Sequence, residues 1–248
     1  MNDFPEVNPA LDSSFALPPD TVAFYADYEQ KRSRLTTFFR LILAIPHLIV
    51  LSLYGIVAIL AVFVAWFALL FTAKYPEGLY NFVVGFQRYA TRVNAYTFLV
   101  TDKFPPFNGN PDEAYAAHFL IGPPKEKYSR AKTFFRFILI IPFYIVAYIL
   151  TLVFELVAFV AWLVIVITGK QPRGIQDAMT FCLGFIIRVY SFYLFTTEDW
   201  PKFSDEEVTR SLQERGYQGT IPPTDGVVAA APAAAPPMPP APPAPPAV

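Results

Sequence analysis

The sequence contains little charge and almost no cysteine. Of its 248 residues, 16% are Asp, Glu, Lys or Arg and 54% are hydrophobic, and the formal net charge is −1. Such a composition is unusual for a soluble protein, and the lack of a basic excess argues against nucleic acid as a partner. The single cysteine, Cys182, excludes an intramolecular disulfide and a cysteine metal cage, and its apolar surroundings predict a small buried side chain.

Sequence motifs that carry chemistry are also missing. The chain has no Gly-rich phosphate loop, no His-Glu-x-x-His pair, no Gly-x-Ser-x-Gly elbow and no Asp-rich calcium loop. Its two histidines, His47 and His118, are far apart in the sequence and have no Cys or acidic cluster at ligand spacing. We therefore expect no catalytic residue, no metal site, no cofactor and no enzyme activity.

The sequence has instead two long apolar runs, over residues 34–76 and 130–172. A straight helix over residues 37–72 would be ~54 Å long at ~1.5 Å per residue, well beyond a hydrocarbon core of ~30 Å. One upright transmembrane helix is therefore excluded for each run.

Two arrangements fit such a run. It could form a hairpin of two short spans that turns near residues 52–55, or an interfacial helix that ends near Pro46 and leads into one tilted span. Lys and Arg flank both ends of both runs, and such residues collect on the cytoplasmic side of a membrane. Because a hairpin places all four basic ends on one side, we favour hairpins, either fully crossing or re-entrant. The termini and the linker between the runs are then cytoplasmic.

The two runs belong to an internal repeat. Shifting the sequence by 96 positions aligns residues 34–107 with 130–203 without a gap, and 26 of the 74 pairs are identical. TFFR, FVAW and the exit segments TDKFPPF and TEDWPKF recur in register. A fixed period of this kind indicates two copies of one supersecondary unit. Two such hairpins would enter the membrane in the same orientation, related by an axis along the membrane normal.

Shorter elements surround the runs. The segment LYNFVVGFQRYATRVNAYTFLV places Arg88 and Arg92 on one helical face and aromatic residues around the rest, which predicts an amphipathic interfacial helix. Residues 21–28 and 114–122 are candidates for short strands. The predicted organisation is a flexible arm (1–20), membrane repeat 1 (21–107), a linker with a strand (108–127), membrane repeat 2 (128–203), a short soluble helix (204–218) and a disordered Ala/Pro-rich tail (219–248).

These motifs resemble a known family. TTFFRLILAIPHLIVL, VAWFALLFTAKYPEGLYNFVVG and RVNAYTFLVTDKFPPF are similar to a bacterial membrane family catalogued as domain of unknown function 4389. The resemblance is specific in the first copy and looser in the second. It implies an integral protein of the bacterial cytoplasmic membrane and supplies no catalytic residues. The expected fold is thus an all-α, multi-pass membrane protein of two tandem repeats, each a transmembrane or re-entrant hairpin plus an amphipathic interfacial helix, with short strand segments.

Glu155 is the one acidic residue within the apolar runs. A carboxylate at the centre of a membrane helix costs on the order of 2.5–3.5 kcal/mol on insertion scales. We expect Glu155 to lie at a hairpin turn near the far interface, where it is hydrated. The alternative is a proton relay or an intramembrane pair.

Basic and acidic residues recur in both copies. Arg92 and Arg188 could pair with Asp102 and Glu198, which would fix each interfacial helix against its exit segment. A second hypothesis is that five arginines bind anionic lipid headgroups. These are Arg40, Arg88, Arg92, Arg136 and Arg188.

Two functions remain open on the sequence alone. The first is a non-enzymatic accessory or scaffold protein that packs against other membrane proteins or anionic lipid. The alternative is a small transporter or channel that acts as a homo-oligomer with Glu155 in its pathway.

Overall fold

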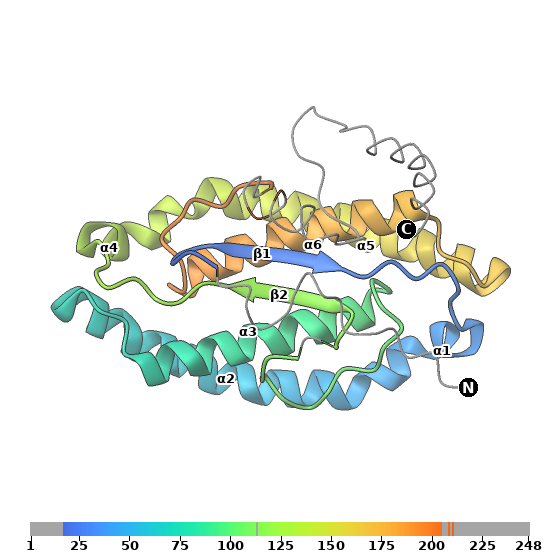
Figure 1. The fold of residues 1–248 in the computed structure, drawn as a ribbon, viewed down its shortest axis with the longest axis horizontal. Coiled ribbons are helices and arrows are strands. Elements are labelled where there is room, and N and C mark those ends of the chain that lie inside the picture. Colours follow the sequence, from blue (N-terminus) through green and yellow to red (C-terminus); the bar gives the residue numbers. More distant parts are fainter. Residues whose placement is uncertain (1–16, 113, 205–207, 209, 211–248) are drawn as a thin grey trace, which may run out of the picture.

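The computed structural model describes residues 17–112, 114–204, 208 and 210. Most of the predicted N-terminal arm, most of the predicted helix over 204–218 and all of the Ala/Pro-rich tail lie outside these residues. The elements in chain order are β1 (Val22–Ala26), α1 (Arg34–Phe38), α2 (Arg40–Thr72), α3 (Glu77–Thr97), β2 (Ala117–Ile121), α4 (Arg130–Leu139), α5 (Ile141–Thr168) and α6 (Arg173–Tyr193). The described chain is therefore mostly helical, with one short antiparallel ribbon (Figure 1).

Each long apolar run forms one continuous helix, so the predicted hairpin turns are wrong. α2 has 33 residues, and both Pro46 and the expected turn at residues 52–55 lie inside it. α5 has 28 residues and is equally uninterrupted. The turn region lacks loop-forming residues, and a continuous helix satisfies every backbone group within its own segment. The alternative break near Pro46 is misplaced in repeat 1, where α1 ends at Phe38. In repeat 2 the break does fall beside the equivalent Pro142, since α4 ends at Leu139 and α5 begins at Ile141.

The real hairpins lie at the basic ends of the runs. α2 ends at Ala73 and α5 at Gly169, both in the left-handed conformation (φ 57° and 70°), which closes a helix by satisfying its last carbonyls. After a few residues the chain reverses into α3 or α6, which packs along the preceding long helix. The amphipathic helices predicted as interfacial are thus the second arms of helical hairpins.

The molecule is built in three layers. The β1–β2 ribbon lies on α3 and α6, and these two helices pack in turn on α2 and α5 (Figure 1). β1 runs along α6, because Arg188 Nε donates to the Val22 carbonyl (3.1 Å) near one end and Arg173 lies over the Tyr28 ring just beyond the other. β2 runs along α3 in the same way. Ribbon and helices are therefore aligned lengthwise.

The two repeats are interlocked by a reciprocal exchange. α1 packs on α5 of the second repeat, and α4 packs on α2 of the first. The backbone bonds agree: Arg32 N–H donates to the Gly169 carbonyl (3.0 Å), and Tyr128 N–H donates to the Ala73 carbonyl (2.8 Å). These four residues are equivalent in pairs under the 96-residue shift. The fold is accordingly pseudo-two-fold symmetric, and neither repeat is complete without the other.

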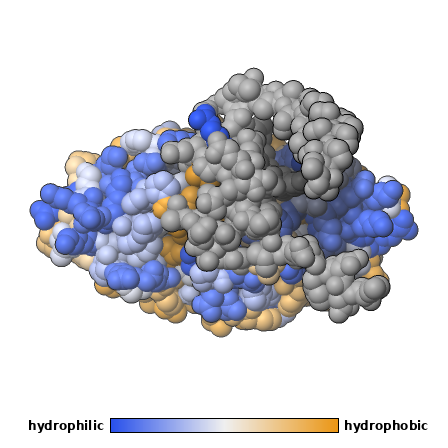
Figure 2. Space-filling view, in the orientation of Figure 1, coloured by the Kyte–Doolittle hydropathy of each residue, from blue (hydrophilic) through white to orange (hydrophobic). Residues whose placement is uncertain are grey.

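Small residues line the buried side of the long helices. Ala44, Ala58 and Ala65 of α2 are fully buried, as is Ala161 of α5. Side chains of this size let the backbones of two helices approach closely. Seen from the ribbon side, the surface not covered by grey atoms is mostly hydrophilic, and apolar side chains gather at its rim (Figure 2).

Candidate functional site: an apolar face, two basic tips and a groove

α1, α2, α4 and α5 expose large apolar side chains along their whole lengths. Only 22% of the most apolar window of each long helix is buried, and both helices are long and apolar enough to cross a membrane. The core helix of a soluble protein would be mostly buried. We call these exposed side chains the apolar face; its most exposed members include Leu35, Leu41, Leu53, Ile59, Phe71, Ile138, Leu156 and Ile167.

Exposed cations gather at two tips beside the apolar face, in symmetry-equivalent positions. The first basic tip consists of Lys31, Arg34 and Lys170, and the second of Lys127, Arg130 and Lys74. Each tip combines two residues of one repeat with one of the other. An isolated β-bridge between Lys31 and Lys170 holds the first tip together. In the second tip, Arg130 Nη2 donates a hydrogen bond to the Phe71 carbonyl (2.8 Å).

Two of the arginines predicted to contact lipid are buried in the core. Arg40 has 2% of its surface exposed and Arg136 has none. Arg40 donates to Asp102 and to the Thr101 carbonyl (3.1 Å). Arg136 donates to the carbonyls of Phe192 and Thr197, both at 2.6 Å. Burial lowers the pKa of Arg136 to about 10, although nearby Glu198 opposes this shift. This geometry favours a structural role for both.

Arg92 and Arg188 hold connecting segments in place. Arg92 Nη2 donates to the Asn110 carbonyl (2.7 Å), and Arg188 donates to the carbonyls of Val22 and Phe203. Both are 5% exposed or less, so Arg92 does not lie on a water-exposed face as the amphipathic pattern predicted. Arg88 of α3 is half-buried, and burial lowers its pKa and that of Arg92.

The predicted pairing of Arg92 with Asp102 and of Arg188 with Glu198 is wrong. Among the described residues no ion pair joins either couple, and each acid instead serves the start of a short helix. Asp102 accepts from Ser33 N–H (2.9 Å), and Glu198 accepts from Ser129 N–H (2.6 Å). Ser33 and Ser129 are the N-caps of α1 and α4, and a carboxylate is favourable at that end of a helix. Recurrence in both copies signalled importance but did not identify the partner.

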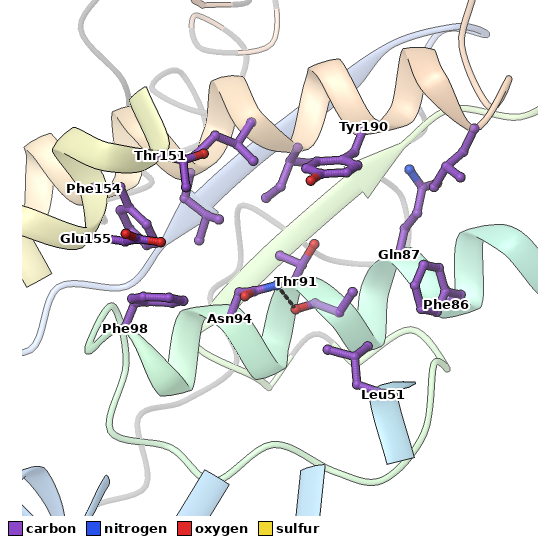
Figure 3. A pocket seen from close by; sticks show the side chains of 15 residues that line it. Leu51, Phe86, Gln87, Thr91, Asn94, Phe98, Thr151, Phe154, Glu155 and Tyr190 are labelled. Atoms are coloured by element: carbon purple, nitrogen blue, oxygen red, sulfur yellow. Dashed lines mark hydrogen bonds between the residues drawn. The ribbon is translucent and has the colours of Figure 1, made fainter. Parts of the chain in front are cut away.

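Glu155 does not lie at a turn, as the sequence predicted, but in the middle of α5 with its side chain exposed. It lines a groove of about 390 Å³ that opens between the two repeats. Side chains from all four large helices converge there, and Figure 3 shows Phe154 and Glu155 of α5 facing Asn94 of α3 and Phe98 just after it. The rings of Phe98 and Phe154 are 4.9 Å apart.

The histidines and the cysteine have ordinary surroundings. His47 is buried, hydrogen-bonds to the Tyr89 hydroxyl (2.9 Å) and stacks on Phe107. His118 pairs with Asp27 at 3.2 Å. Cys182 is buried within the core. Within the described part of the chain, no three His, Cys, Asp or Glu side chains are grouped to hold a metal ion.

Sequence reasoning missed two features of this surface. The cations of the basic tips were used only to assign topology, although their exposure makes them better candidates for lipid contact than the buried arginines. Four exposed tyrosines in a cavity next to the groove were also missed, because they come in pairs from two helices; they are Tyr144, Tyr148, Tyr190 and Tyr193. The pseudo-symmetry could have revealed them, since their counterparts in repeat 1 are Leu48, Ser52, Asn94 and Thr97.

Comparison with protein families gives one match, found twice. The model of the family described as "Domain of unknown function (DUF4389)" matches residues 34–108 and again residues 130–205. The two matches coincide with the two halves of the interlocked fold. No curated protein and no solved structure matches the chain.

Proposed function

The chain belongs to the DUF4389 family through both of its repeats, and from this premise we propose that it is a non-enzymatic accessory or scaffold protein attached to a membrane by its apolar face. The observation that carries the proposal is the exposure of large apolar side chains along both long helices. Apolar patches on soluble monomers rarely exceed a few hundred Å², so a face of this extent needs a cover. Lipid is the cover that its length and composition fit.

The proposed orientation has the long helices lying in the membrane plane. At ~1.5 Å per residue α2 is ~50 Å long, and it exposes apolar residues from end to end, against a hydrocarbon core of ~30 Å. The ribbon runs alongside the helices, so an upright molecule would immerse the ribbon and its charged connectors in lipid. These connectors carry exposed or half-exposed charged side chains, among them Asp27, Lys103 and Asp112. In the flat orientation these polar layers face the cytoplasm, and the pseudo-two-fold axis lies along the membrane normal.

The basic tips would complete this attachment. Each lies next to exposed apolar residues such as Leu35 or Phe71, which matches the pattern of residues that sit at headgroup depth. A Lys or Arg near an anionic surface contributes about 1 kcal/mol of attraction. Six such cations at symmetric positions favour anionic lipid as the partner and the cytoplasmic leaflet as the location.

Depth measurements test the orientation against the multi-pass arrangement, which stays a competing proposal. Spin labels would be placed at Leu41, Ser52 and Phe63, all exposed on α2, in a Cys182→Ser background. Because residues 41 and 63 are ~33 Å apart along the helix, a crossing helix puts them at opposite interfaces. The flat orientation predicts similar depths for all three labels in one leaflet. A deep label at residue 52 with shallow, opposite ends would refute it.

Vesicle flotation tests the lipid preference. We expect wild-type protein to bind phosphatidylglycerol vesicles more tightly than phosphatidylcholine vesicles, with an advantage that shrinks in high salt. Replacing Arg34, Lys170, Arg130 and Lys74 by Gln should remove most of that advantage. Lys103→Gln with Lys202→Gln is the matched control, because both lysines lie in connectors. Equal binding to the two lipids by wild type would contradict the role of the tips.

A transporter or channel that acts as a homo-oligomer is the second candidate, and one observation favours it. Glu155 lines a groove between the repeats, as a residue in a transport pathway would. Flux of an ion or solute in liposomes that depends on Glu155, together with a defined oligomer in detergent, would support this candidate. Stoichiometric partner proteins retained after mild solubilisation would support the scaffold.

A further inference from the structure

The groove at Glu155 continues into a second cavity lined by tyrosines. This cavity measures about 440 Å³ and shares Thr151 and Tyr190 with the groove. Tyr144, Tyr148 and Tyr193 line it from α5 and α6, and each is 41–60% exposed. Both volumes fall in the range of ~300–1,000 Å³ typical of small-molecule sites. Because the two cavities meet at Thr151 and Tyr190, we treat them together and call them the tyrosine groove.

The chemistry of the tyrosine groove exists in only one of the two repeats. Glu155 replaces an isoleucine of repeat 1, and the tyrosines at 144 and 148 replace Leu48 and Ser52. Packing between repeats therefore does not require these side chains, since the equivalent positions hold the same fold without them. Their presence on one side of the pseudo-two-fold axis points to a role specific to this groove.

Glu155 has no cationic partner within the part of the chain that the structure describes. Among the described residues, no ion pair or hydrogen bond to its carboxylate is found, whereas Asp102 and Glu198 are both paired. Its neighbours on α5, Leu152 and Leu156, are exposed parts of the apolar face. A carboxylate in such surroundings requires a counter-charge or water to offset its desolvation. A ligand that enters the groove from the lipid side could provide that charge.

We propose that the tyrosine groove binds a membrane lipid whose headgroup carries an ammonium group, with the ammonium between Glu155 and the tyrosine rings and a hydrocarbon chain along α5 and α6. A carboxylate and tyrosine faces attract the same charge, because the face of an aromatic ring is electronegative. The apolar lining from Phe98, Phe154 and Ile187 suits the chain. An anionic headgroup would meet the charge of Glu155 directly and is disfavoured. The inference rests on the proposed membrane attachment only for the source of the ligand.

Native mass spectrometry of the detergent-solubilised full chain tests this inference without vesicles. Phosphatidylethanolamine and phosphatidylglycerol with identical acyl chains are added in equal amounts, and the bound fraction of each is measured. We expect wild type to retain phosphatidylethanolamine at least tenfold better. Glu155→Gln should abolish this preference, whereas Glu126→Gln, at an exposed acid of the linker, should leave it unchanged.

Two further variants separate the headgroup from the chain. Ala90→Trp places a large ring in the groove and should reduce retention of both lipids, and Tyr190→Leu should weaken only the preference for the ammonium headgroup. Unaltered thermal unfolding of Glu155→Gln would show that it is folded. Equal retention of the two lipids by wild type, or an undiminished preference in Glu155→Gln, would overturn the inference. Because the basic tips play no part in this experiment, its failure would leave the proposed attachment intact.

Discussion

The pair of Arg40 and Asp102 joins the start of α2 to the segment that follows α3, and its contribution to the stability of the first repeat can be measured. The Arg40 side chain is 2% exposed and the Asp102 side chain 17%, and the two are hydrogen-bonded. Arg40→Met keeps most of the length of the side chain but removes the charge and the donors. The variant leaves a carboxylate with one backbone donor, Ser33 N–H, and with Arg32 at 4.0 Å.

The expected cost follows from these remaining contacts. Removing one partner of a buried pair typically destabilises a protein by ~3–5 kcal/mol. Because Asp102 is partly exposed and keeps two neighbours, we expect about 3 kcal/mol for Arg40→Met. Asp102→Asn should cost a similar amount, since it removes the counter-charge of the buried Arg40 guanidinium and leaves Arg32 with the mostly exposed Glu29 at 3.7 Å. The double variant should be more stable than the sum predicts, by ~2 kcal/mol.

The assay is guanidinium unfolding in a mild detergent, followed by tryptophan fluorescence, on wild type, both single variants and the double variant. Lys202→Met serves as a control, because its ion pair with Asp199 is exposed and should contribute less than ~1 kcal/mol. If the two single effects add within ~0.5 kcal/mol, the two side chains are not coupled and the reasoning from the structure is refuted.

Two further predictions use the pseudo-symmetry as an internal control. Gly169→Ala should destabilise the protein by ~1–2 kcal/mol, because φ is 70° there, whereas Ala73→Gly at the equivalent position (φ 57°) should stabilise it by up to ~1 kcal/mol; changes of the same sign in thermal unfolding would contradict this. Ala65→Leu and Ala161→Leu should each cost ~1–3 kcal/mol, since both alanines are fully buried between helices. Unchanged denaturation midpoints for both would show that the alanine stripes are not tightly packed.

Local sequence signals predicted several elements correctly because their causes are local. The β-branched and aromatic residues near Phe24 and Phe119 became β1 and β2, which pair in the structure. The amphipathic pattern around Arg88 became a helix, but it could not show which neighbour would cover its polar face.

Long-range partners could not be predicted, because recurrence in two copies marks a residue without identifying the side chain that it contacts. Asp102 lies ten residues after Arg92, so an ion pair between these two neighbouring residues was expected. The structure joins Asp102 to Arg40, 62 positions away, because α3 brings the chain back beside the start of α2. Similarly, basic residues at both ends of a run suggested a hairpin inside it. In the structure the chain reverses after the run instead, and α3 or α6 forms the second arm of the hairpin.

The sequence by itself determined the duplication, the family, the two long apolar runs and the absence of recognisable catalytic motifs, since these depend on composition and periodicity along the chain. Only the tertiary structure decided that the two copies exchange their first helices, that four of the recurrent arginines are buried, and that Glu155 lies in a groove beside tyrosines. The physical reason is that burial and pairing depend on which surfaces meet. In this chain, α1 and α4 meet the long helix of the other repeat, whereas α3 and α6 pack mainly on the long helix of their own.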